Sequence, residues 1–300
     1  MKTLPLRRMA AGGFLPLISL AWAPAASAAD TVQLYGLIDA GVQVLNHGPK
    51  DGSRLGMASG NLNGSRWGLR GNEDLGNGLK AVFTLEGGFD PGNGKALQGT
   101  RLFGRQAYVG LADRSLGTLT LGRQNTLMID WMSKFTPLQN ATYGGKRIDP
   151  AFSDRMDNAI KYGNKFGGLS VGAYYSFGWN NEQSWSDKNT GRMIGAGLRY
   201  QQGGLDAAVL FHTKRADAPR APADSSNRED RVLGALSYDF GGVTLYGGYR
   251  WLEQKLVQRN YVSRLYWAGA RYRATPATHL SLAYYYMDGT TCDNLNVAAC

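Results

Sequence analysis

The sequence predicts an all-β protein that forms a transmembrane antiparallel β-barrel. Three observations predict this fold class: apolar side chains recur with a period of two, short and long connections alternate along the chain, and glycine and aromatic residues are abundant. The 300 residues include 41 Gly, 16 Tyr, 10 Phe and 7 Trp. Only 10 Pro and 2 Cys occur, which excludes a collagen-like chain and a scaffold of several disulfides.

Residues 1–28 have the composition of a secretory signal peptide. They combine a start with three Lys and Arg residues, a mostly apolar stretch, and the small-residue sequence Ala26-Ser27-Ala28 at the expected cleavage point. The expected mature chain is 29–300. Without the three basic residues, 30 Lys and Arg remain against 23 Asp and Glu, a formal charge of +7. We therefore expect an exported, basic protein.

The period of two is clear in the segment 169–178, where Leu169 and Val171 alternate with Ser170 and Gly172. Such a period places alternate side chains on opposite faces of a sheet. After residue 28 the chain has no run of 18 apolar residues, so we expect no transmembrane helix. We count 13 strands, of which the clearest are 32–45, 65–71, 79–88, 169–178, 192–202, 231–240, 243–251, 264–273 and 279–287.

The connections between these strands alternate in length. Short connections such as 72–78 and 241–242 follow long ones such as 46–63 and 214–230. This is typical of an outer-membrane barrel with periplasmic turns and extracellular loops. A secreted β-sandwich also alternates, but its solvent face would be rich in charge. Here one strand face carries Tyr, Trp, Leu and Val and the other carries Arg, Lys, Asp and Gly, which favours the barrel.

Five segments resemble the Gram-negative general porins of the betaproteobacterial type, and the resemblance extends from 32 to 289. It implies a 16-stranded barrel that forms a homotrimer in outer-membrane lipid and lipopolysaccharide. Each monomer would enclose a water-filled channel for passive diffusion of small hydrophilic solutes and inorganic ions. The segments are LYGLIDAG (34–41), SGNLNGSRWGLRGNEDLGNGLKAVFTLEGGF (59–89), FGRQAYVGL (103–111), GTLTLGRQ (117–124) and DNAIKYGNKFGGLSVGAYY (157–175).

The resemblance also implies that the third extracellular loop, 125–156, folds inward and narrows the pore. A long segment is tolerated inside a barrel because it lines a water-filled cavity and does not face lipid. The loop differs from the strongly acidic loop of the enteric general porins, which tend to prefer cations. It carries both signs of charge, on Asp130, Asp149, Asp154, Lys134, Lys146, Arg147 and Arg155.

In this family, arginines on the barrel wall face the constriction loop. Motif matching assigns Arg66, Arg105 and Arg155 to that cluster, and parity supports Arg66 because Trp67 occupies the other face. For Arg105 and Arg155 a position at the rim, paired with lipopolysaccharide phosphate or a nearby Asp, remains the alternative. A few guanidinium groups in a narrow aqueous pore attract anions and repel cations, so we expect an anion preference.

Parity adds three charged residues that face the lumen, Arg70, Lys80 and Asp39. Arg123 shares parity with Leu119 and Leu121, so we expect it to point outward or to lie at a strand end. The residues expected at the pore constriction are therefore Arg66, Arg70, Arg105, Arg155, Asp39, Lys80, Asp130, Asp149 and Asp154.

Other functions are less consistent with the sequence. His212 and His279 lie on predicted strands, but no nucleophile motif accompanies them, so we expect no enzyme, no cofactor and no metal site. No basic run or recognition module indicates nucleic-acid binding. The alternatives are a substrate-specific channel, since residues 284–286 are three consecutive Tyr, and an adhesin that acts through its loops.

The C-terminal end departs from the family pattern. Family members continue for three further strands, whereas this sequence stops at Cys300 within the expected seventh extracellular loop. We expect a C-terminally incomplete barrel that assembles poorly, because unpaired strand edges facing lipid are costly. Cys292 and Cys300 are expected to pair as a disulfide in an oxidising compartment, with two unpaired thiols as the alternative.

Overall fold

The computed structural model describes residues 31–46, 52–99, 101–139, 141–179, 191–215, 227–255 and 259–293. The expected signal peptide and Cys300 lie outside these residues, and so therefore does the expected disulfide. No helix in the described ranges is long and apolar enough to cross a membrane.

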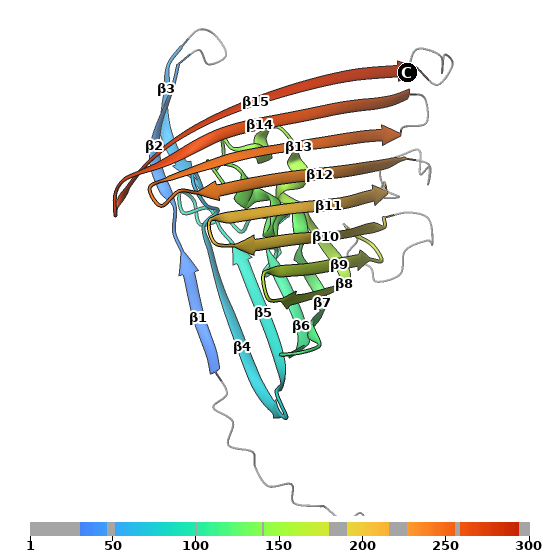
Figure 1. Ribbon diagram of the computed structural model, residues 1–300. Helices are drawn as coiled ribbons and strands as arrows, with labels where there is room; N and C mark the ends of the chain where they lie inside the picture. The colour runs from blue at the N-terminus through green and yellow to red at the C-terminus, as the bar shows by residue number, and fades with distance from the viewer. Residues whose placement is uncertain are drawn as a thin grey trace, which may run out of the picture.

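The described chain forms a 13-stranded sheet in which each strand pairs with its neighbours in sequence. The pairing is antiparallel throughout, which confirms the predicted all-β class. Figure 1 shows the sheet curling around a short, partly helical segment, with β1 and β15 at its two edges. Its strands are β1 (Thr31–Leu37), β4 (Arg66–Gly76), β5 (Leu79–Gly88), β6 (Gln106–Asp113), β7 (Gly117–Asn125), β8 (Arg155–Phe166), β9 (Leu169–Ser176), β10 (Met193–Gln202), β11 (Leu205–Arg215), β12 (Arg228–Asp239), β13 (Val243–Lys255), β14 (Arg259–Thr275) and β15 (Thr278–Asp293).

The first predicted strand, 32–45, is interrupted in the structure. It separates into β1 and β2 (Ala40–Leu45). The strand β2 pairs with β3 (Arg54–Ser59), which lies within the stretch predicted as a long loop. The interruption lies at Asp39, whose carboxylate accepts the backbone N–H groups of Leu62 and Asn63 at 2.8 and 2.7 Å. An acidic side chain that binds backbone amides offers the chain an alternative to the strand ladder, and parity alone does not reveal it.

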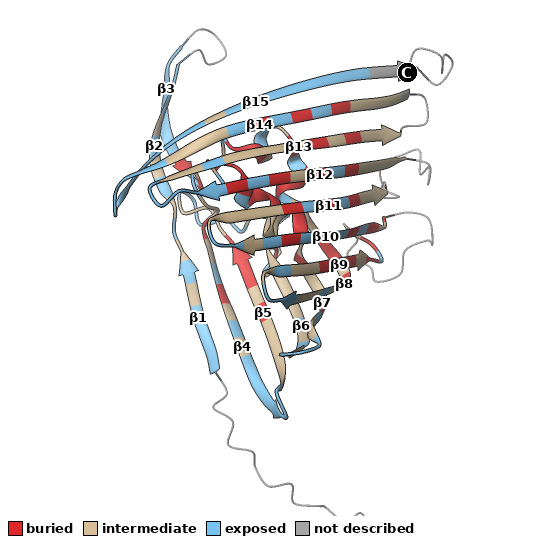
Figure 2. Cartoon of the chain, viewed as in Figure 1, coloured by how far each residue is buried: buried red, intermediate tan, exposed pale blue. Residues whose placement is uncertain are grey.

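The faces of the sheet are inverted relative to a soluble protein. Large apolar side chains are exposed on the outer face, such as Leu34 at 71% and Leu282 at 75%, whereas the interior buries polar groups such as His212 at 0% and Arg250 at 1%. Figure 2 shows the buried residues on the enclosed segment and at alternate positions of the strands around it. This arrangement fits a barrel with lipid outside and polar groups inside.

Exposed aromatic residues lie near the limits of the apolar outer face. Tyr200, Tyr238 and Tyr272 lie near the short turns, and Tyr266 and Tyr286 lie near the middle of the long strands β14 and β15. Such rings of aromatic side chains mark the two lipid–water interfaces of outer-membrane barrels. Two residues beyond the pair Tyr266 and Tyr286, the outer face of β14 and β15 becomes charged.

The segment between β7 and β8 lies inside the curled sheet and packs its apolar side chains against the strands to form the buried core. It contains four short helical turns, and its buried side chains include Met128, Met132 and Phe135, each with 0% exposure. The helical turns are α1 (Leu127–Asp130), η1 (Met132–Phe135), η2 (Gly145–Arg147) and η3 (Pro150–Ser153). This inner segment corresponds to the stretch predicted as the constriction loop.

The outer face predicts a sharp response to charge at its centre. Leu198 in the middle of β10 is 49% exposed and lies opposite Val171 and Val209. We expect Leu198→Arg to lower the free energy of unfolding in lipid vesicles by about 2–4 kcal/mol, because a cation at the bilayer midplane loses its hydration. Leu198→Met is the control and should cost less than about 1.5 kcal/mol. An unchanged urea midpoint for the arginine variant would mean that this face contacts water.

Candidate functional site

A polar cavity of about 690 Å³ lies between the inner segment and the wall formed by β1, β4, β5 and β6. It is lined by five cationic side chains and only two carboxylates, so its formal charge is positive. The cationic residues are Arg66, Arg70, Arg105, Lys134 and Arg199, and the acidic residues are Glu86 and Asp130.

Glu86 organises the wall side of the cavity. Its carboxylate is 2.6 Å from Arg105 Nε and 3.6 Å from Arg66 Nε, and it accepts a hydrogen bond of 2.9 Å from the Tyr35 hydroxyl. Glu86 itself is only 5% exposed. One buried carboxylate therefore orients two guanidinium groups from different segments toward the same space. The parity that places Lys80 inward also applies to Glu86, but Glu86 was not among the residues predicted from the sequence.

Arg155 and Lys146 add positive charge near Arg105, which lines the cavity. Arg155 Nε is buried and has no hydrogen-bond acceptor among the described residues. Its guanidinium interacts electrostatically with those of Arg105 and Arg123. The pKa of Lys146 lies below its usual value of 10.5, first because of burial and then because of repulsion by Arg105 and Arg155. Like charges are thus held close together at this point.

Two other residues predicted at the constriction line the cavity. Arg70 Nε donates to Gln33 at 2.8 Å, and its guanidinium lies over the Tyr35 ring at 5.1 Å. Asp130 forms an ion pair with Lys161. Lys80 points to the same side of β5 as Glu86, but six residues away, which is about 20 Å along a strand, and it is not among the lining residues.

The remaining predicted acidic residues have structural contacts and do not line the cavity. Asp39 accepts backbone N–H groups, which lower the pKa of its carboxyl group. Asp154 follows η3 and is 3.0 Å from Lys214 Nζ. Asp149 is buried against Arg231 and Arg250 on the wall. These partners lie far away in sequence, so the charges of the loop alone could not distinguish them from Asp130.

Of the two positions predicted for Arg123, the strand end is correct and the outward direction is wrong, because Arg123 lies two residues before the end of β7 and turns toward other charged groups. Arg123 donates to the Gly104 carbonyl at 2.7 Å and forms a partly buried ion pair with Asp157. The register of β7 against β8 shifts between Gly122 and Gln124, which is a β-bulge, and Gly122 has φ +125°. A bulge redirects the following side chain, so simple alternation fails at this residue. Lys134 and Arg199 also line the cavity, and the prediction of the constriction did not include them.

Glycines on the inner wall allow the inner segment to lie close to the sheet. A Cβ atom on Gly172 or Gly197 would lie 3.0 Å from the indole ring of Trp131. A Cβ atom on Gly195 would collide with the Tyr174 ring, whose hydroxyl lies 2.6 Å from His212 Nδ1. On the opposite wall, Trp267 Nε1 donates to the Phe135 carbonyl at 2.8 Å. The glycines at 172, 195 and 197 are therefore explained by this close packing.

The fold and the cavity agree with comparisons to known proteins. A family model described as Gram-negative porin matches residues 17–299. The chain belongs to the Gram-negative porin family. It is 38% identical over 251 residues to an outer membrane porin protein of Bordetella pertussis, which covers 75% of this chain and 64% of that protein. It is also 30% identical over 273 residues to the major outer membrane protein P.IB of Neisseria meningitidis, which covers 76% of this chain and 77% of that protein.

Among solved structures, the chain is similar to an anion-selective porin from Comamonas acidovorans, with a TM-score of 0.75 and 26% identity. The match covers 87% of this chain and 80% of that one. The chain matches less than two thirds of the length of the Bordetella porin. These relatives confirm the predicted family and place the protein in the outer membrane of a Gram-negative bacterium.

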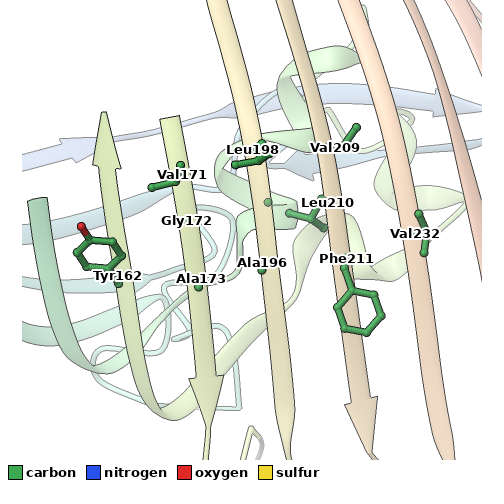
Figure 3. A pocket seen from close by; sticks show the side chains of 11 residues that line it. Tyr162, Val171, Gly172, Ala173, Ala196, Leu198, Val209, Leu210, Phe211 and Val232 are labelled. Carbon is green, nitrogen blue, oxygen red and sulfur yellow. The ribbon is translucent and has the colours of Figure 1, made fainter. Parts of the chain in front are cut away.

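A second, apolar groove of about 480 Å³ lies on the lipid-facing side of this porin sheet, across β8 to β12. Figure 3 shows Val171, Ala173, Ala196 and Leu198 on adjacent strands of the groove. The lining also includes the two glycines that contact Trp131 from the inside. Here a single sheet layer separates the inner segment from the membrane.

The contacts of Glu86 predict how the cavity responds to the loss of this carboxylate. We expect Glu86→Gln to increase the affinity for sulfate about fivefold, because Arg66 and Arg105 lose their anionic partner and a change of about 1 kcal/mol gives this factor. Isothermal titration of the detergent-solubilised protein measures the affinity. The control Glu253→Gln removes the same charge from a pair with Lys255 and should leave the sulfate affinity unchanged. Unchanged binding in Glu86→Gln would show that Glu86 does not offset these arginines.

The lowered pKa of Lys146 predicts a pH dependence. Because this pKa lies below 10.5, Lys146 loses its positive charge at a lower pH than an ordinary lysine. Sulfate affinity should therefore fall as the pH rises through this lowered pKa. This fall in sulfate affinity should be absent in Lys146→Met, because that variant already binds sulfate weakly at neutral pH. A titration curve that is the same for both proteins would contradict the contribution of Lys146.

Proposed function

We propose that this chain forms the wall of a water-filled pore that passes small hydrophilic solutes and inorganic ions passively and prefers anions. The observation that carries the proposal is the excess of cationic side chains over carboxylates around the polar cavity. The inner segment between β7 and β8 is the constriction, and movement of a solute past it requires no chemical step. The assembly that fits an outer-membrane porin is a trimer of identical chains, each with its own pore.

The magnitude of the electrostatic interaction suits permeation. Two unit charges 4 Å apart interact by about 1 kcal/mol in water and by about 4 kcal/mol at an effective dielectric constant of 20. The cavity lies between these limits because protein surrounds it while its contents are aqueous. An anion would therefore be enriched several-fold and still leave quickly. Arginine suits this function because its guanidinium group stays charged and binds carboxylate or phosphate through paired hydrogen bonds.

Arg155 adds a specific feature to this proposal. A buried guanidinium donor without an acceptor is costly, and a solute anion or water close to the wall would satisfy it. The likeness to a porin described as anion-selective supports the same preference. The route for anions would thus run between the residues held by Glu86 and the inner segment.

Reversal potentials in planar bilayers under a KCl gradient test the proposal. We expect an anion-directed potential for the unmodified chain. In Arg66→Ala with Arg105→Ala, the chloride-to-potassium permeability ratio should fall about fivefold or more, because two cations are lost and Glu86 becomes unpaired.

The matched control is Arg264→Ala, which removes a cation from an exposed pair with Asp288 on the outer face. It should keep the original potential. A cation-directed potential in the unmodified protein would overturn the anion preference while keeping the channel, and the absence of any conductance would overturn the channel itself.

A further inference from the structure

The second half of the inner segment contacts the wall through two carboxylates, Asp154 beside Lys214 and the more deeply buried Asp149. Asp149 precedes η3, and its side chain is 1% exposed. Its Oδ2 atom lies 2.9 Å from Arg250 Nε and 3.2 Å from Arg231 Nε. Its Oδ1 atom accepts the Ala151 N–H at 3.0 Å, which caps the helical turn. The same side chain therefore fixes the local shape of the segment and its contact with the sheet.

The two arginines come from adjacent wall strands and are held in place by other wall residues. Arg231 Nη1 donates to Glu229 at 2.8 Å, and Arg250 Nη1 donates to the Ser263 hydroxyl at 2.6 Å. Arg231 and Arg250 are 4% and 1% exposed. The wall thus presents a rigid pair of cations to the inner segment before any solute arrives.

The charges of this cluster balance only when Asp149 is present. Arg231 has a second carboxylate partner in Glu229, but among the described residues the ion pair of Arg250 is with Asp149 alone. Removing one partner of a buried pair leaves an uncompensated charge, which is much more costly than losing an exposed pair. The contact of the segment with Arg250 therefore depends on Asp149, whereas Asp154 makes a separate, less buried ion pair with Lys214.

The first half of the inner segment is held differently. Trp131 lies against the glycines of β9 and β10, and the Phe135 carbonyl accepts a hydrogen bond from Trp267. These contacts do not involve Asp149. The contacts of Asp149 with the wall are therefore separate from those that hold the first half.

We propose that Asp149 is the positioning residue that holds residues 145–154 against β12 and β13 and so sets the cross-section of the pore. The statement that this contact sets the cross-section of a pore rests on the proposed function, but the attachment of residues 145–154 to the wall does not. Asp149 is buried and does not line the cavity. It therefore acts on the width of the pore and has little direct effect on the electrostatic potential inside it.

Hydrogen exchange of the full chain in detergent micelles, read by mass spectrometry, tests the attachment without requiring a current. In Asp149→Asn, protection of amides in 145–154 should fall at least about tenfold, because Arg250 loses its carboxylate. Protection in β9 and β10 should stay the same. The control Asp288→Asn removes an equal charge from the outer face and should change neither region. Unchanged protection of 145–154 in Asp149→Asn would overturn the proposal.

A second variant keeps the test decisive if Asp149→Asn fails to fold. Arg250→Met removes the same contact from the wall side, and it too should reduce protection of 145–154 while the strands stay protected. If both variants fold, their effects should be less than additive, because they remove one shared interaction. Full additivity, or unchanged protection in Arg250→Met, would overturn the attachment.

Recordings in planar bilayers then distinguish an effect on the position of the inner segment from an effect on the charge of the cavity. Asp149→Asn should raise single-channel conductance and current noise while leaving the reversal potential unchanged, whereas Glu86→Gln should shift the reversal potential and leave the noise unchanged. A shifted potential without added noise in Asp149→Asn would overturn the positioning role. If the unmodified chain conducts no current but the exchange result holds, the proposed function fails and the attachment of the segment stands.

Discussion

A backbone that crosses lipid must satisfy its N–H and C=O groups within its own fold, because the hydrocarbon offers no hydrogen-bond partners. Here the continuous antiparallel ladder from β1 to β15 meets this requirement for the strands between its two edges. Once the ladder is fixed, alternate side chains must face lipid and interior in turn. The apolar outer face, the aromatic residues near its limits and the polar inner wall all follow from this constraint.

The inner segment is the second consequence of that constraint. It is not a strand, so its backbone can lie at membrane depth only inside the sheet. It needs a wall that leaves room for it, which the glycines at 172 and 197 provide, and it needs charged contacts that hold it. The cavity is the space left between the segment and the wall formed by β1, β4, β5 and β6. The cavity is positive because it is lined by more cationic side chains than carboxylates.

The all-β class, the 13 strands of the main sheet and the inverted faces could be predicted from the sequence, because they follow from the two-residue period and from the residue types on each face, whereas the small sheet of β2 and β3 was not predicted. The period fails where a local feature changes the direction of the chain. Asp39 interrupts the first strand by binding backbone amides, and the bulge at Gly122 turns Arg123 toward Asp157. Neither feature leaves a mark in the alternation of apolar residues.

The candidate site was less predictable, because parity gives a direction but not a partner. It indicated that Arg66 faces inward, and the structure shows the contact with Glu86 that orients it. For the acidic residues of the loop, the same sequence signal describes Asp130, which lines the cavity, and Asp149, which is buried at the wall. Only the three-dimensional position of the inner segment distinguishes Asp130 from Asp149.

The close contact between Trp131 and the wall glycines couples two parts of the chain that are distant in sequence. A transferred loop whose bulky residue met the sheet at a position that carries a side chain would collide with it. The shape of the loop and the small residues of the wall are therefore linked. Chimaeras that exchange the loop would need to exchange the small residues of β9 and β10 with it.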